Sequence, residues 1–387
     1  MIIFGAGVIG EATLHACRAK GIQVGWFVDD RLTGRLMGLP IITTLDLSTS
    51  FDRDAETLFL TSPNIVDMIV PAEALGFNWK SCGEVLQGFD LSTADFTQGR
   101  NQEYSIEHIK YLVQTCLHHH DNYLQPWKLS VQSVDLMITE KCSMKCKDCS
   151  NLMQYYEHPE NADLAQMYAM IDGLCEKMDE IYEFRVIGGE PFMHKDLHTV
   201  VEYVRKKPNV LKVSIFTNGT ILPREHQWAA FEHSKVRLFI TDYDALSRNI
   251  KPLVAELERR GIAFVSEKAN NWTNCATLYK HDRTVAENEA LFAQCCAKNL
   301  ATLADGRLYR CPFAANAAKL RAVPDYQEDY LVVTDASRDQ IRHFLREKNY
   351  IDTCDHCNGR SYGDKVIAPG IQTKTLLKYK HYNLANV

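Results

Sequence analysis

The chain has no long apolar run and no surplus of positive charge. Of its 387 residues, 43 are Lys or Arg and 49 are Asp or Glu, so the formal net charge is −6. This balance offers no electrostatic attraction to nucleic acid or to an anionic membrane, and we expect neither as a partner. No apolar stretch approaches the ~20 residues that span a bilayer. Residues Met1–Gly5 form no basic leader, so the expected location is the cytoplasm.

Cysteine, in contrast, is abundant. The chain has 13 cysteines, an odd number, and a reducing compartment disfavours a disulfide framework. Metal or cluster ligation explains their clustering better. Four cysteines lie in segments with regular patterning and are interpreted as core or surface thiols: Cys17, Cys82, Cys116 and Cys175.

Three further cysteines follow a short buried strand predicted at 134–139. Cys142, Cys146 and Cys149 are spaced by three and then two residues in a polar loop that contains lysines. Most electron-transfer iron–sulfur clusters use four cysteines, so three thiolates suit a cluster with one iron left open to another molecule. A zinc knuckle is the alternative, although zinc usually takes four Cys or His ligands and no fourth is close in sequence.

Two more predicted strands end in polar turns. Strand 184–187 leads into Gly188, Gly189 and Glu190, and the strand at 213–216 leads into Thr217 and Asn218. The glycines let the backbone approach a ligand closely, and the Glu190 carboxylate can accept a charged hydrogen bond from an ammonium group.

The three runs together resemble the radical S-adenosylmethionine (radical SAM) superfamily, with its C-x3-C-x2-C, GGEP and TNG motifs in this order. The resemblance implies a 4Fe–4S cluster on the three cysteines whose open iron binds S-adenosylmethionine. The GGEP glutamate would hold the cofactor's amino group, and the TNG turn would lie near its ribose and methionine parts. Asp148 departs from the aromatic residue that many members place beside the adenine.

The first ~95 residues form a separate pattern. A strand at 2–4 leads into Gly5, Gly7 and Gly10, and a second strand at 23–28 ends at Asp29. A G-x-G-x-x-G turn between strand and helix, with an acid about 20 residues on, is typical of dinucleotide sites. Strands at 39–42 and 57–61 follow, but this segment is short for the two mononucleotide-binding halves of a full dinucleotide domain. The pattern resembles the Rossmann-like domain of nucleotide-sugar acyltransferases; a nucleotide sugar, a dinucleotide and no ligand all remain open.

Residues 96–130 are predicted as a connector with a helix at about 105–124. It carries a run of three histidines, His118–His120, for which metal binding is one interpretation. Adjacent helical positions point in different directions, so we favour a solvated helix end.

Residues 131–290 alternate strands with helices at 162–179, 196–206, 224–233 and 245–260. Such alternation predicts a parallel sheet. The resemblance implies the partial (β/α)6 TIM-type barrel of the superfamily, so the expected fold class is α/β.

Residues 291–387 carry a second cysteine group. A hairpin predicted about Asp305–Gly306 places cysteines at both ends. This arrangement is similar to the twitch or SPASM-type extensions that hold an auxiliary 4Fe–4S cluster, and the resemblance implies as ligands Cys296, Cys311, Cys354 and Cys357. Cys295 in place of Cys296, Cys275 as a spare ligand, and zinc in place of iron remain open.

The sequence therefore predicts a radical SAM enzyme with two clusters, fed by a reducing donor such as flavodoxin or ferredoxin. The 5′-deoxyadenosyl radical would abstract hydrogen from a small molecule, with a nucleotide-linked sugar as the leading class, in a dehydrogenation or an epimerisation. Cys275, Tyr155 and Tyr156 are candidates for contact with the substrate. A peptide-modifying maturase and a non-catalytic metal-binding scaffold are the alternatives.

Overall fold

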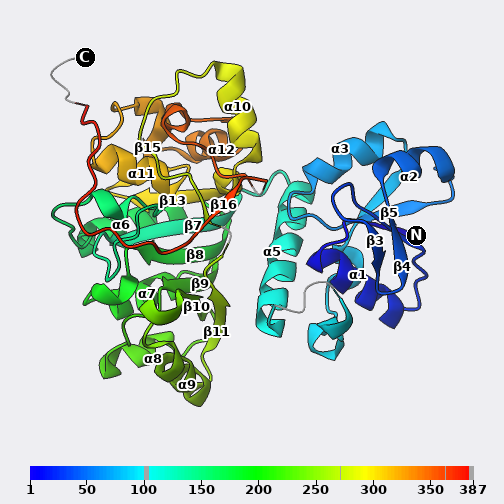
Figure 1. Ribbon diagram of the computed structural model, residues 1–387, viewed down its shortest axis with the longest axis horizontal. Helices are drawn as coiled ribbons and strands as arrows, with labels where there is room; N and C mark the ends of the chain where they lie inside the picture. The colour runs from blue at the N-terminus through cyan, green and yellow to red at the C-terminus, as the bar shows by residue number, and fades with distance from the viewer. Residues whose placement is uncertain (100–103, 271, 362, 383–387) are drawn as a thin grey trace. The chain divides into compact units, whose positions relative to one another are not determined.

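The computed structural model describes residues 1–99, 104–270, 272–361 and 363–382. Contacts between residues divide the chain into two compact units, Met1–Lys128 and Leu129–Val387, each with its own hydrophobic core (Figure 1).

The N-terminal unit contains one six-stranded sheet. Its strands are β1 (Ile2–Phe4), β2 (Trp26–Val28), β3 (Gly34–Leu36), β4 (Leu39–Ile42), β5 (Thr57–Leu60) and β6 (Asn78–Ser81). The spatial order is β3-β4-β2-β1-β5-β6, and every pair except β3–β4 is parallel. Apart from the edge strand β3, this is the order typical of a doubly wound α/β sheet. The length of this segment suggested little room for the second half of a dinucleotide-binding domain. Strands β5 and β6 nevertheless form a short second half beside β1.

Five helices accompany this sheet: α1 (Val8–Ala19), α2 (Thr44–Ser50), α3 (Val66–Ala74), α4 (Gly83–Leu86) and α5 (Ile106–Leu124). Helix α5 begins where the sequence predicted it, because the Ser105 side chain accepts a hydrogen bond from the N–H of His108 at 3.2 Å. The interpretation of the histidine run as solvated is wrong, because His118 and His120 are buried. His120 continues the buried face of Ile109, Val113 and Cys116, at spacings of three and four residues.

The C-terminal unit is built on an eight-stranded sheet with the order β11-β10-β9-β8-β7-β13-β14-β15. Its strands are β7 (Ser130–Thr139), β8 (Glu180–Gly188), β9 (Val210–Thr217), β10 (Val236–Asp242), β11 (Ala263–Lys268), β13 (Leu300–Ala304), β14 (Arg307–Tyr309) and β15 (Tyr330–Val332). Strands β7 to β11 are parallel and adjacent in chain order, as in a TIM-type partial barrel. A sixth parallel strand, β13, lies on the β7 edge of the sheet rather than beside β11.

Apolar and polar side chains alternate along β7, and the apolar ones point to the side of the sheet that the helices cover. Val134, Leu136 and Ile138 pack in the main core with the helices. These are α6 (Leu164–Cys175), α7 (Leu197–Arg205), α8 (Trp228–Phe231) and α9 (Ile250–Arg260), which line one side of the sheet in Figure 1. Asp135 and Ser133 alternate with that set and point to the opposite face, hereafter the inner face, which is free of these four helices.

The predicted hairpin at Asp305–Gly306 is confirmed. Strands β13 and β14 are antiparallel, and the two turn residues have φ values of 49° and 81°, the left-handed pair that a tight two-residue hairpin requires. The hairpin belongs to the main sheet, which therefore continues across residue 290. Three helices alternate along the chain with these last strands: α10 (Val285–Gln294) before β13, α11 (Pro312–Lys319) after β14, and α12 (Arg338–Arg346) after β15. A separate two-stranded sheet pairs β12 (Trp272–Thr273) with β16 (Val366–Ile367).

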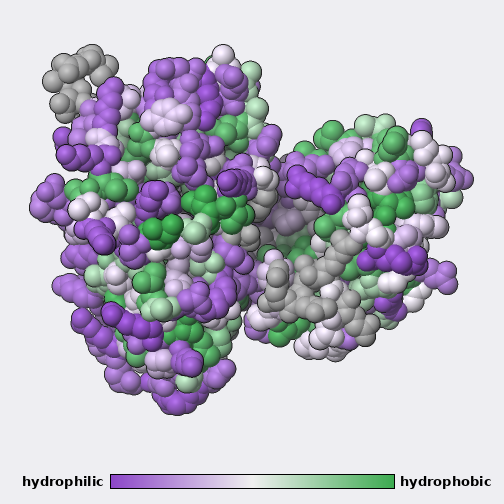
Figure 2. All heavy atoms as spheres, viewed as in Figure 1, coloured by the Kyte–Doolittle hydropathy of each residue, from purple (hydrophilic) through white to green (hydrophobic). Residues whose placement is uncertain are grey.

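Hydrophilic residues predominate on the face of the larger unit drawn in Figure 2, with apolar residues in small scattered groups. Large apolar side chains that are exposed, such as Leu45 and Trp127, are usual when they occur singly. Within the described ranges, no helix combines the length and apolarity that crossing a bilayer demands.

Candidate active site

The loop with Cys142, Cys146 and Cys149 follows β7 at the carboxyl edge of the parallel sheet, where barrel enzymes carry their reactive residues. The next turn is fastened to it by backbone bonds: the N–H of Gly189 donates to the carbonyl of Thr139 at 2.9 Å. The N–H of Glu190 donates to the carbonyl of Lys141 at 2.8 Å.

Two glycines make this approach possible. A Cβ on Gly189 would lie 2.3 Å from the Lys141 carbonyl oxygen and 2.8 Å from the Cβ of Cys142. A Cβ on Gly188 would lie 2.2 Å from the Thr139 carbonyl oxygen. The predicted reason for these glycines was a close approach to a ligand, whereas the contact that requires them is with the backbone of the cysteine loop.

The three thiols are enclosed and receive N–H donors. Burial raises the pKa of Cys142 to about 12 and that of Cys146 to about 11. The N–H of Met144 donates to the Cys142 sulfur at 3.5 Å, and Nε2 of Gln372 donates to the Cys146 sulfur at 3.2 Å. Thiols must lose their protons to bind metal, and N–H donors aimed at sulfur stabilise the thiolates that result. These three residues therefore fit an iron–sulfur cluster.

Gln372 belongs to a C-terminal strap, defined here as residues 368–382. The N–H of Lys147 donates to the carbonyl of Ile371, and the N–H of Thr373 donates to that of Lys145, both at 2.7 Å. In Figure 1 this segment, drawn in red, crosses the unit near β7. Sequence reasoning missed it, because no local pattern indicates a contact between residues 226 positions apart.

Glu190 joins the second and third motifs. Its fully buried carboxylate accepts hydrogen bonds from the Thr217 hydroxyl at 2.9 Å and from the N–H of Asn218 at 2.8 Å. Burial raises the pKa of Glu190 to about 7. Asn218 continues to the first motif, since its Nδ2 donates to the Cys142 sulfur at 3.7 Å and to the Ser143 hydroxyl at 3.3 Å. All three sequence motifs thus converge on one edge of the sheet.

The second group of cysteines also comes together. Cys311 caps the start of α11, while Cys354 lies in the short helix η9 (Asp352–His356) and Cys357 follows it. Burial, followed by the charges of Cys275, Cys311 and Cys354, raises the pKa of Cys357. Nη1 of Arg283 braces this turn by donating to the carbonyls of Cys354 and Cys357 at 3.1 and 3.0 Å.

Cys295 and Cys296 lie where α10 passes into the short helix η7 (Cys296–Asn299). The S–H of Cys295 donates to the Cys296 sulfur, and this hydrogen bond lowers the pKa of Cys296. Cys295 interacts electrostatically with Cys311, and Cys275 with Cys296. The four predicted ligands and both alternatives are thus linked pairwise by electrostatic interactions between neighbouring thiols.

The inner face of the sheet carries charge beside these thiols. Nε of Arg185 on β8 lies 2.7 Å from Oδ1 of Asp135 on β7, and burial raises the pKa of Asp135 to about 6. The Arg185 charge also contributes to lowering the pKa of Cys296. Burial raises the pKa of Cys149 and of Cys275, and the charge of Arg360 opposes that rise for both. Arg360 therefore lies within electrostatic range of both cysteine groups.

The tyrosine candidates have partners inside the protein. The Tyr156 hydroxyl is buried and donates to Oδ1 of Asn316 at 2.7 Å. The Tyr155 hydroxyl donates to the carbonyl of Ala276 at 3.4 Å, and its ring meets Tyr379 of the strap edge-on at 5.4 Å.

In the N-terminal unit, the glycine turn has the expected close contacts. Gly5 has a φ of +109°, and a Cβ on Gly10 would lie 2.1 Å from the Gly5 carbonyl oxygen, whereas Gly7 has open space around it. Neither carboxylate oxygen of Asp29 is free for a ribose, because Oδ1 accepts the N–H groups of Arg31 and Leu32 at 2.9 and 3.0 Å. Its Oδ2 accepts the N–H of Ala6 at 3.0 Å, and this bond closes the turn.

With this geometry established, comparison with known proteins identifies the central segment. Residues 136–264 match the family model described as the Radical SAM superfamily, and this part of the chain is a radical SAM domain. A GTP 3′,8-cyclase of Stenotrophomonas maltophilia (strain R551-3) is 31% identical over 96 residues, which cover 23% of this chain and 27% of the relative.

An S-adenosylmethionine-dependent nucleotide dehydratase of Selenomonas ruminantium is 33% identical over 89 residues, which cover 23% of this chain and 30% of that protein. The chain thus spans less than a third of the length of these curated relatives. The crystal structure of BtrN in complex with AdoMet and 2-DOIA aligns with a TM-score of 0.41 and 16% identity, over 61% of this chain and 98% of that one. That score is too low to establish a shared fold.

Proposed function

We propose that this protein is a radical SAM enzyme that cleaves S-adenosylmethionine reductively. Its substrate is a small nucleotide-linked molecule, with a nucleotide-linked sugar as the leading class. The observation that carries the proposal is the convergence of the cysteine loop, the Gly188–Glu190 turn and the Thr217–Asn218 turn on the carboxyl edge of the sheet. All three lie inside the segment that matches the radical SAM model.

Cys142, Cys146 and Cys149 would hold a 4Fe–4S cluster. Once reduced by an external electron donor, such a cluster would supply one electron to bound S-adenosylmethionine, whose cleavage would yield methionine and a 5′-deoxyadenosyl radical. Glu190 would orient the cofactor's ammonium group as an ionised carboxylate. It accepts hydrogen bonds from the backbone of Asn218 and from the Thr217 hydroxyl, which hold its position before the cofactor arrives.

Cys296, Cys311, Cys354 and Cys357 would hold an auxiliary 4Fe–4S cluster, which suits a dehydrogenation because it can accept an electron. Cys275 lies beside this group as a buried thiol whose pKa burial raises. A protonated thiol there would suit hydrogen return to a substrate radical, and thus an epimerisation.

The substrate class rests on charge between the two cysteine groups. Arg360 is a positive group within electrostatic range of thiols in both groups, and Arg guanidinium is suited to phosphate. The names of the relatives, a GTP cyclase and a nucleotide dehydratase, agree with a phosphate-bearing substrate. In the N-terminal unit, the open space at Gly7 before α1 offers a second place for a nucleotide moiety.

Anaerobic reconstitution of the full chain tests the proposal. We expect about eight irons per chain, four for each cluster, and 5′-deoxyadenosine after reduction in the presence of S-adenosylmethionine. Cys149→Ala should abolish the nucleoside, whereas Cys175→Ala, on α6, should not. Zinc at both cysteine groups without any nucleoside would mean a metal-binding scaffold. Stimulation of nucleoside formation by peptides but not by nucleotide sugars would overturn the substrate class.

A further inference from the structure

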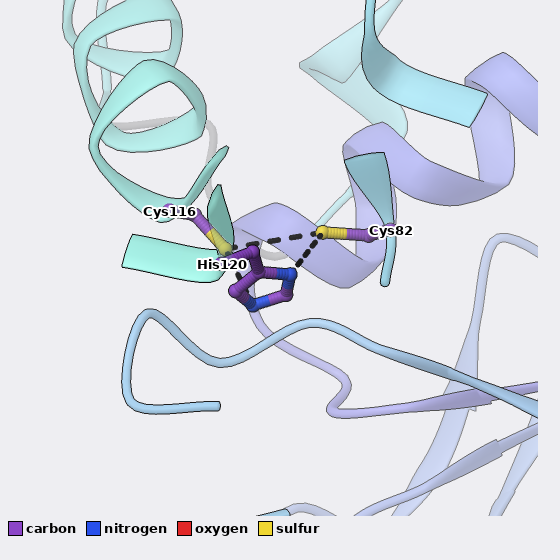
Figure 3. Close-up of side chains that lie close together, drawn as sticks. All are labelled: Cys82, Cys116 and His120. Atoms are coloured by element: carbon purple, nitrogen blue, oxygen red, sulfur yellow. Dashed lines mark hydrogen bonds between the residues drawn. The ribbon is translucent and has the colours of Figure 1, made fainter. Parts of the chain in front are cut away.

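Three metal-ligating side chains meet in the core of the N-terminal unit. Cys82 precedes α4 at the end of β6, and Cys116 and His120 lie one turn apart on α5, so both project from the same side of that helix (Figure 3). One potential ligand atom from each residue lies within 4.8 Å of the others. Cys82 and Cys116 are fully buried, and His120 is 1% exposed.

Two of the distances match the edges of a tetrahedral zinc site. Zinc binds sulfur at about 2.3 Å and imidazole nitrogen at about 2.0 to 2.1 Å, which gives S–S edges of about 3.8 Å and S–N edges of about 3.6 Å. The sulfurs of Cys82 and Cys116 are 3.9 Å apart, and Nδ1 of His120 lies 3.8 Å from the Cys82 sulfur. The Cys116 sulfur lies 3.5 Å from Nε2, the other nitrogen of the ring, so this distance is not an edge of a site that binds through Nδ1.

The hydrogen bonds of His120 indicate which nitrogen would bind. Nε2 lies 2.8 Å from the carbonyl oxygen of Ser62 and must carry the proton, because a carbonyl only accepts. Nδ1 therefore holds the lone pair, and its nearest polar neighbour is the Ser81 hydroxyl, with the Cys82 sulfur 3.8 Å away. Metal-binding histidines usually donate their other N–H to a carbonyl or carboxylate in this way. Ser81, whose hydroxyl lies 2.6 Å from Nδ1, would turn aside or serve as an oxygen ligand.

Ordinary core packing accounts less well for this arrangement. Cys17 is equally buried in the same apolar cluster, yet no described Cys or His places a ligand atom close enough to form such a group with it. Two thiolates and an imidazole are soft and intermediate ligands that favour Zn²⁺, and a buried thiolate is tolerated when it coordinates a metal.

We infer that Cys82, Cys116 and His120 bind one zinc ion, independently of the radical chemistry proposed for the other unit. The ion would link the end of β6 to α5 across 34 residues of chain. Three protein ligands leave a fourth position for Ser81 or a water molecule.

Zinc content of the full-length chain, measured by mass spectrometry of the metals, tests this inference. The triple variant lacking Cys142, Cys146 and Cys149 should retain the zinc, which separates this site from the cluster loop. His120→Gln should lose about one equivalent per chain, while His120→Cys, which restores a ligand, should retain it. The matched control Cys17→Ser should leave the zinc unchanged.

Equal zinc in the parent chain and in His120→Gln would overturn the inference. So would a Cys82–Cys116 disulfide found by peptide mass spectrometry in the zinc-free chain as isolated. If the His120 variants do not fold, Co²⁺ should still produce the visible absorption of tetrahedral thiolate-bound cobalt in a chain whose cluster cysteines are replaced by serine: Cys142, Cys146, Cys149, Cys296, Cys311, Cys354 and Cys357. Its absence would contradict a metal site.

Discussion

Replacement of Gly189 by alanine tests whether the glycine turn is there to receive the cysteine loop. The added Cβ would lie 2.3 Å from the Lys141 carbonyl oxygen and 2.6 Å from its carbon, and both are backbone atoms. Ordinary carbon–oxygen contacts begin near 3.4 Å, so one of the two segments must move by about 1 Å. The φ of Gly189 is not in the left-handed region, so the cost comes from the contact alone.

Overpacking of this kind typically costs about 1 to 3 kcal/mol. For a unit of ~250 residues, each kcal/mol lowers the melting temperature by about 2 to 4 °C, so we expect Gly189→Ala to lower it by roughly 2 to 12 °C. Displacement of Lys141 also moves Cys142, which is next in the chain. The variant should therefore hold less iron than the parent after reconstitution.

Differential scanning calorimetry of the full chain and iron analysis are the measurements. Gly25→Ala is the control, because nothing lies within 4 Å of a Cβ there, and its melting temperature should match the parent's. A Gly189→Ala protein with the parent's melting temperature and iron content would refute the close contact between turn and loop.

Three further predictions concern the same unit. Gln372→Leu removes the N–H donor to the Cys146 sulfur, so the loaded protein should have a lower cluster reduction potential in an EPR-monitored titration. The pKa of Glu190, about 7 in the folded state against 4.5 unfolded, means that its protonation stabilises the fold at low pH and that this stability is lost as pH rises through 7. Between pH 5 and 8, the free energy of unfolding measured in urea should therefore fall by about 2.5 kcal/mol more for the parent than for Glu190→Gln. Arg185→Met leaves the buried Asp135 carboxylate without its cation and should cost about 3 to 5 kcal/mol at pH 8, less at pH 5 where Asp135 is protonated.

Each of these has a result that would contradict it. An unchanged potential in Gln372→Leu would mean that the strap does not act on the cluster. Parallel pH profiles for the parent and Glu190→Gln would show that this carboxyl keeps an ordinary pKa when folded. Equal loss of stability at both pH values in Arg185→Met would assign the cost to lost packing rather than to the charge of Asp135.

Local pattern was sufficient for much of the central unit. The strand–turn motifs at Cys142, Gly188 and Thr217 lie where periodicity and glycine placed them, and the Asp305–Gly306 hairpin has the turn that its residues favour. Helix α5 begins close to the predicted residue 105. These features depend on residues a few positions apart, which is the range over which propensity and turn chemistry act.

Contacts between distant segments were beyond that range. The strap reaches Cys146 through Gln372, and the ion pair of Asp135 with Arg185 depends on β7 and β8 lying side by side. The histidine run was read as solvated because its polarity was judged without the fold, whereas α5 buries His120.

The sequence by itself determined the spacing of the thiols, the order of the motifs and the alternation that produces a parallel sheet, since each is written in neighbouring residues. Only the tertiary structure decided that β13 adds to the β7 edge, that Glu190 bonds to the Thr217–Asn218 turn, and that Cys82 meets Cys116 and His120. The physical reason is that side chains become neighbours through the packing of whole elements, and that packing is set by the sum of many apolar contacts.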